Sequence, residues 1–160
     1  MREEYRYFKQ GSLDVLSKPF AINEIEKIEV MEFTSKGNFE EALRECFEIA
    51  LEEGNDFYVY ENEKEILCVF GLVRTPLVKE GTYAGTPWLL SSENFKPDSE
   101  FIRESKRVVN EDMLSNGVTV LHNYIHQDNV KAIRWLKWIG FKFLMHPWKD
   151  DYREFYLYKE

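Results

Sequence analysis

The sequence is poor in cysteine, and its two cysteines, Cys46 and Cys68, do not have the spacing of metal ligands. Both lie among apolar residues, so we expect two buried free thiols in a reducing compartment and no metal site. No apolar run approaches the roughly 18 residues that span a membrane, and the first four residues do not resemble a signal peptide. These absences predict a cytoplasmic protein that does not enter membranes.

Basic residues are also in deficit, because 21 Lys and Arg stand against 29 Asp and Glu, for a net charge of -8. A chain this acidic has no overall attraction to DNA, RNA or anionic lipid, so nucleic-acid and membrane partners are not expected. Hydrophobic residues make up 44% of the chain and aromatic residues 16%, which is typical of a globular protein with a well-filled core. The length of 160 residues predicts a single domain over 1–160.

Hydrophobic periodicity predicts an alternation of strands and helices along the whole chain. Strands are expected at 5–8, 57–60, 66–73, 83–91, 118–125, 141–145 and 154–158. Helices are expected at 12–16, 22–32, 38–53, 97–116 and 129–138. This order of elements predicts an α/β fold with a mixed central sheet of about seven strands and helices on both faces.

The most informative motif follows the strand expected at 118–125. It covers the next helix and the start of the strand after it. Asn129-x-x-Ala132-Ile133 is followed, eight residues after the alanine, by Gly140-Phe141. Together with the order of elements, this motif resembles the GNAT fold of N-acetyltransferases that use acetyl-CoA. Three segments resemble, more narrowly, small GNAT-like proteins encoded by tailed phages: 85–90, 101–109 and 133–141.

The resemblance implies where acetyl-CoA would lie. In GNAT enzymes the cofactor occupies a V-shaped cleft between the fourth and fifth strands, and the backbone of the fourth strand pairs with the pantetheine arm. Backbone amides at the start of the next helix hold the pyrophosphate, helped by the helix dipole. The cofactor contacts implied for this chain are Leu89, Leu90, Ser91, Lys96, Asn129 and Trp135. Asn129 is equally explained as a helix cap.

The segment that corresponds to the phosphate-binding loop departs from the family pattern. Residues 89–100 contain no glycine, and Pro97 removes one N–H donor. Glu93, Asp98 and Glu100 place negative charge where the phosphates would lie. We therefore expect competition between these carboxylates and a bound phosphate.

The residues for proton transfer depart from the pattern too. The tyrosine that serves many GNAT enzymes as general acid falls at Leu136, which has no proton to give. His122, Tyr124 and His126 alternate onto one face of the strand at 118–125 and offer other candidates, although a half-exposed strand face has the same pattern. A metal site at the two histidines lacks a third ligand in the sequence.

Two functions follow as hypotheses. In the first, the chain is an N-acetyltransferase in which an amine attacks the thioester of acetyl-CoA. A backbone N–H near Leu89 or Leu90 holds the oxyanion, and Glu93 or His122 takes the amine proton through water. The acidic surface favours a basic acceptor, such as a lysine side chain or a polyamine.

In the second, the chain is a non-catalytic phage protein that acts in virion assembly or binds a host protein. The glycine-free loop and Leu136 favour this alternative. It places the protein in the host cytoplasm or in the virion.

Overall fold

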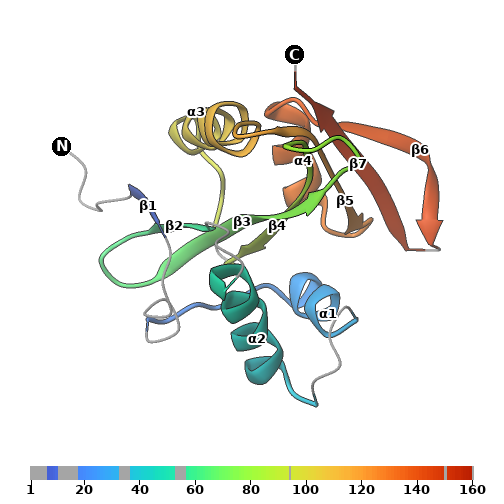
Figure 1. Cartoon of the computed structure of the whole chain (residues 1–160). Coiled ribbons are helices and arrows are strands. Elements are labelled where there is room, and N and C mark those ends of the chain that lie inside the picture. The colour runs from blue at the N-terminus through green and yellow to red at the C-terminus, as the bar shows by residue number, and fades with distance from the viewer. Residues whose placement is uncertain are drawn as a thin grey trace. The chain divides into compact units, whose positions relative to one another are not determined.

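The computed structural model describes residues 7–10, 18–32, 37–52, 57–93, 95–149 and 151–159 (Figure 1). The elements in order are β1 (Tyr7–Gln10), α1 (Glu24–Glu32), α2 (Phe39–Glu52), β2 (Phe57–Glu61), β3 (Ile66–Pro76), β4 (Tyr83–Ser91), α3 (Ser99–Arg107), the π-helical η2 (Val108–Met113), β5 (Val118–His126), α4 (Val130–Trp138), β6 (Lys142–Lys149) and β7 (Tyr152–Tyr158). The helix expected at 12–16 falls outside the described residues. Among the described helices, none is long and apolar enough to cross a membrane.

The strands form a seven-stranded sheet in the order β1-β2-β3-β4-β5-β7-β6. β2 is antiparallel to β1 and β3, β4 is parallel to β5, and β7 is antiparallel to β5 and β6. A mixed sheet of this kind confirms the α/β class that the order of elements predicts.

The chain divides into two compact units, each made of two stretches of sequence. Unit 1 comprises Met1–Leu72 and Trp88–Phe95, and unit 2 comprises Val73–Pro87 and Lys96–Glu160. Strands β3 and β4 therefore each belong partly to one unit and partly to the other.

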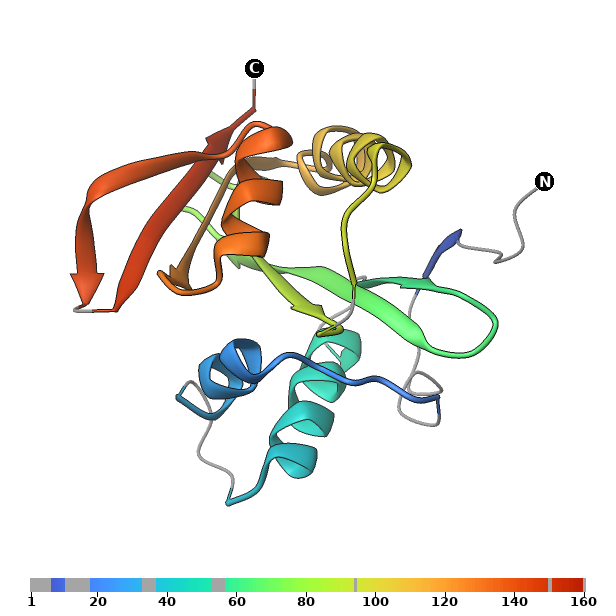
Figure 2. The same ribbon diagram turned by 180° about the vertical axis from the view of Figure 1, so that it is seen from behind.

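The core of unit 1 is built where α2 meets the sheet. The side chain of Asn38 caps α2 by accepting from the Glu41 N–H at 2.9 Å, as the sequence predicts. Phe47 of α2 stacks on Phe57 of β2 with ring centroids 5.2 Å apart, and Trp88 of β4 lies 5.9 Å from both rings. α1 and α2 lie side by side in both views (Figures 1 and 2).

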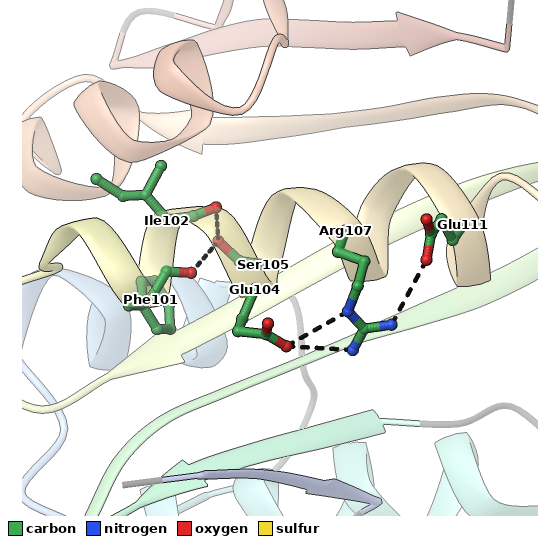
Figure 3. A network of polar contacts seen from close by, with 6 residues as sticks. All are labelled: Phe101, Ile102, Glu104, Ser105, Arg107 and Glu111. Carbon is green, nitrogen blue, oxygen red and sulfur yellow. Dashed lines mark hydrogen bonds and ion pairs between the residues drawn. The ribbon is translucent and has the colours of Figure 1, made fainter.

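The core of unit 2 depends on the contact between α3 and α4. Trp135 of α4 lies 5.5 Å from the Phe101 ring and donates its indole N–H to Ser105 Oγ at 2.8 Å. Figure 3 shows how Ser105 in turn reaches the carbonyls of its own helix, at 2.7 Å for Phe101 and 3.1 Å for Ile102. A buried hydroxyl is satisfied by these bonds, so the two helices are held at one register.

The helix expected at 97–116 differs from the observed one at both ends. It begins at Ser99, because Asp98 has extended backbone and acts as the N-cap. After Arg107 it continues as the π-helical η2, and Leu114 N donates to Val109 O at 3.0 Å, a step of five residues. On its outer side Arg107 pairs with Glu104 at 3.3 Å and with Glu111 at 3.7 Å (Figure 3).

A glycine on β3 is required by the aromatic core of unit 1. A Cβ at Gly71 would lie 2.6 Å from Trp88 Cζ2 and 2.7 Å from Phe57 Cβ, which is closer than carbon atoms approach. We predict that Gly71→Ala lowers the free energy of unfolding by about 1–3 kcal/mol, because the core is overpacked. Urea denaturation followed by circular dichroism measures this change.

Gly37→Ala is the matched control, since a Cβ there meets nothing within 4 Å. It should change stability by no more than about 0.5 kcal/mol. Equal effects of the two substitutions would contradict the packing of Trp88 over Gly71.

Candidate functional site

The parallel ladder between β4 and β5 is short. Its recorded pairs are Tyr83 with Val118, Ala84 with Val120 and Gly85 with Leu121. Two residues further on, the hydrogen bond between the strands comes from a side chain. Asn123 Nδ2 donates to Pro87 O at 2.6 Å. Pro87 has no N–H, so it cannot donate to a continued ladder at this point.

The backbone groups of β4 alternate between two edges, as in any strand. Tyr83 N donates to Gly117 O at 2.8 Å, toward β5, whereas Ser92 N donates to Leu67 O at 2.8 Å, toward β3. Odd-numbered residues of β4 therefore direct their N–H and C=O groups away from β3. Leu89 and Ser91, two of the expected cofactor contacts, are on this edge.

A short segment of the chain itself pairs with the end of this edge. Ile22 forms an isolated antiparallel bridge with Ser92. Asn23 N donates to Ser91 O at 3.0 Å, and Glu93 N donates to Ala21 O at 2.8 Å. We call residues 19–23 the β4-edge segment. Because Ile22 pairs with Ser92 in an extended conformation, α1 starts at Glu24 and not at residue 22 as the sequence predicts.

A buried carboxylate completes this pairing. Glu26 is fully buried and accepts from the Ser91 N–H, and both of its carboxylate oxygens lie 3.1 Å from Ser91 Oγ. Asn23 Nδ2 lies 3.1 Å from the same Ser91 Oγ. A polar group is costly to bury unless it is hydrogen-bonded, so these contacts hold α1 against the end of β4.

Glu26 has only one signal in the sequence, and that signal is ambiguous. Asn23 and Glu26 have the three-residue spacing of a capping box, and Asn23 Oδ1 does accept from Glu26 N at 2.9 Å. The Glu26 side chain goes to Ser91, which is 65 residues away in sequence. No local pattern indicates such a distant partner.

Two of the three candidates for proton transfer on β5 are brought together. The rings of His122 and Tyr124 are 5.1 Å apart, edge to face. His122 Nε2 also lies 3.1 Å from Glu154 Oε2 on β7, and 40% of the histidine side chain is exposed. The sequence does not indicate Glu154 as a partner of His122, because only the pairing of β5 with β7 brings the two residues close.

The third candidate on β5, His126, lies in a different setting. Its Nδ1 accepts from Asp128 N at 3.1 Å, and its ring lies 5.3 Å from Tyr152. Within the described ranges no three His, Cys, Asp or Glu residues are grouped to hold a metal ion. His126 therefore helps to form the turn before α4.

The N-terminus of α3, where the resemblance implies phosphate binding, carries an acidic cap. Asp98 caps α3, and its Oδ1 accepts from Phe101 N at 2.8 Å. A carboxylate is thus bound at the helix N-terminus where the resemblance places the pyrophosphate. Lys96, in unit 2, and Glu93, in unit 1, both have exposed side chains.

The remaining expected cofactor contacts are largely buried. Asn129 is 6% exposed and caps α4 through Ala132 N at 3.4 Å. Trp135 and Leu136 are buried in unit 2, and Leu90 is buried in unit 1, whereas Leu89 is half-buried. A cofactor contact at Asn129 or Trp135 stays a prediction, since each side chain has a structural role here.

The cysteines offer no activated nucleophile. Cys68 is buried and Cys46 is partly buried, and both are free thiols. Burial, with a smaller contribution from the neighbouring Glu45 carboxylate, raises the pKa of Cys46. A raised pKa leaves less of the reactive thiolate at neutral pH.

The role of Trp135 can be tested by removing its N–H alone. We predict that Trp135→Phe lowers the free energy of unfolding by about 1–3 kcal/mol, because Ser105 Oγ loses a buried donor. Trp138→Phe is the control, since Trp138 is 52% exposed and its loss should cost no more than about 0.5 kcal/mol. Weaker acetyl-CoA binding with unchanged stability in Trp135→Phe would instead assign this side chain to the cofactor.

No family model matches the sequence, and no curated protein matches it. Solved structures do match it along almost its whole length. Spermidine N-acetyltransferase from Vibrio cholerae, in complex with CoA and spermine, is 11% identical with a TM-score of 0.65, over 96% of this chain and 95% of that one. N-acetyltransferase PseH from Campylobacter jejuni, in complex with acetyl coenzyme A, is 18% identical with a TM-score of 0.54, over 98% and 100%. An acetyltransferase of the GNAT family from Streptococcus pneumoniae is 7% identical with a TM-score of 0.59, over 96% and 99%.

At these identities the matches concern the fold and not the activity. They cover almost the whole chain, so they concern its complete order of elements. The chain therefore has the GNAT acetyltransferase fold, as the motif around Asn129 and the order of elements predict.

Proposed function

We propose that this protein is an acetyl-CoA-dependent N-acetyltransferase that acts on a basic amine. The observation that carries the proposal is the edge of β4 at Leu89. Leu89 is the residue between Pro87 and Ser91 whose backbone points away from β3. An N–H on such an edge can donate to the thioester carbonyl and stabilise the oxyanion that forms there.

The reaction would proceed by direct transfer. The amine nitrogen attacks the carbonyl carbon of the thioester, and a C–N bond forms. The C–S bond then breaks, and the CoA thiolate leaves. One proton of the amine passes to a base, and the thiolate takes up a proton from an acid or from water.

The proton carriers that we propose are on β5. Nε2 of His122 is held by Glu154, which fixes the orientation of the ring. Tyr124 lies against the same ring and carries a phenol proton. We assign the base to His122 and the acid to Tyr124, with the exposed Glu93 as the other candidate base.

A basic acceptor fits the charge of the chain. A net charge of -8 attracts a polyamine or a lysine-rich peptide and raises its local concentration. The structural neighbour from Vibrio cholerae is a spermidine N-acetyltransferase, which makes polyamines a reasonable first class of acceptor.

The test compares two substitutions of Leu89. Leu89→Pro removes the N–H, and Pro87 shows that this edge of β4 accepts a proline. Leu89→Ala shortens the side chain and keeps the N–H. We predict that kcat of Leu89→Pro falls about 100-fold below that of Leu89→Ala, measured by release of the CoA thiol with spermidine as acceptor.

Thermal unfolding of both variants checks that they are folded. Equal kcat values for two folded variants would remove Leu89 N–H from the mechanism. No acetyl-CoA binding by calorimetry at millimolar concentration would remove the enzymatic function itself.

A second candidate function is supported by Asp98 and Leu136. The Asp98 carboxylate occupies the α3 N-terminus, and Leu136 has no proton to give, so this alternative is a non-catalytic phage protein used in virion assembly or host binding. It is tested by mass spectrometry of purified phage particles and by the same calorimetry. Particles that contain the polypeptide, with no acetyl-CoA binding, would establish the assembly role over the enzymatic one.

A further inference from the structure

We infer that the β4-edge segment, together with Glu26, is a built-in gate on the cofactor path. The segment and the pantetheine arm of acetyl-CoA would use the same backbone groups of β4, so that each excludes the other. This inference rests on the proposed function, because it supposes that the arm pairs with β4.

The hydrogen bonds of β4 carry the inference. On the edge away from β3, Pro87 O accepts from Asn123, Ser91 N and O are bonded to Glu26 and Asn23, and Glu93 N is bonded to Ala21. Between these bonds only Leu89 has the same orientation. Adjacent positions on one edge are about 6.6 Å apart, so a single position is too short a platform for an arm with two amide groups.

The gate is held by the start of α1. Asn23 caps α1 by accepting from Glu26 N, and its N–H and side chain both bond to Ser91. The Glu26 carboxylate bonds to Ser91 from the first turn of the same helix. Release of Ser91 is therefore coupled to the N-terminus of α1, and the segment and that turn leave β4 together.

One apolar side chain anchors the segment. Ile22 is 3% exposed and belongs to the core cluster that contains Leu43, Phe47 and Leu90. Removal of the gate would expose this side chain, which favours the closed state in the absence of cofactor. Only the open molecules would then bind CoA. The apparent affinity for CoA would therefore equal the intrinsic affinity multiplied by the open fraction.

The first experiment weakens the anchor and leaves Ser91, Asn23 and Glu26 unchanged. Ile22→Ala should raise the open fraction and tighten CoA binding by about tenfold in calorimetry. Ile28→Ala is the matched control, since Ile28 is in α1 and 45% exposed. It should bind CoA as the unsubstituted protein does, and circular dichroism checks that both variants are folded.

The second experiment uses the unsubstituted protein, so that it does not depend on the folding of a variant. Amide hydrogen exchange is followed by NMR with and without saturating CoA. The Asn23 N–H loses its partner Ser91 O when the gate opens, so its exchange should become faster when CoA is bound. The Leu114 N–H, which is bonded to Val109 O at the end of η2, provides an internal reference.

The outcomes separate the gate from the proposed function. Faster Asn23 exchange with bound CoA, or CoA binding that is detected only in Ile22→Ala, supports the gate. CoA binding with unchanged Asn23 exchange, and no gain in Ile22→Ala, overturns the gate and leaves the acetyltransferase intact. No binding to either protein at millimolar CoA overturns both.

Discussion

The contact between the Glu26 carboxylate and the Ser91 N–H is the interaction on which the end of β4 depends. It places a fully buried carboxyl group against the last residue of the strand and fixes α1, the β4-edge segment and Ser91 in one arrangement. A buried carboxylate without hydrogen-bond partners would be strongly destabilising, so the geometry of all three parts is constrained together. In the gate that we propose, the same contact would control access to this edge of β4.

Two carboxyl groups of the chain accept hydrogen bonds from backbone N–H groups of the kind that the proposed acetyl-CoA site would use. Glu26 accepts from Ser91 N in unit 1, and Asp98 accepts from Phe101 N in unit 2. The chain therefore combines the GNAT acetyltransferase fold with two carboxyl groups bonded to its own backbone amides. The fold alone does not establish activity, because function depends on the residues of the site.

Much of the fold follows from local patterns in the sequence. The apolar run in β3, the capping Asn38 of α2 and the Asn129 motif predict their elements because each signal lies within a few residues. The β4-edge segment could not be predicted, since residues 19–23 have no strand periodicity and pair with a strand about 70 residues away. Glu26 looks like any other glutamate of α1 until Ser91 is placed beside it, and Glu154 meets His122 only through the pairing of β5 with β7.

The interleaved composition of the two units has a consequence for synthesis of the chain. Unit 1 requires Trp88–Phe95, so it cannot close until the ribosome has passed the residues of unit 2 that precede this stretch. Until then the Glu26 carboxylate has no Ser91 to bond and stays hydrated at the surface of an unfinished sheet. Dehydration of this carboxyl group is thus a late event of translation, and it coincides with the arrival of the stretch Trp88–Phe95 that completes the unit.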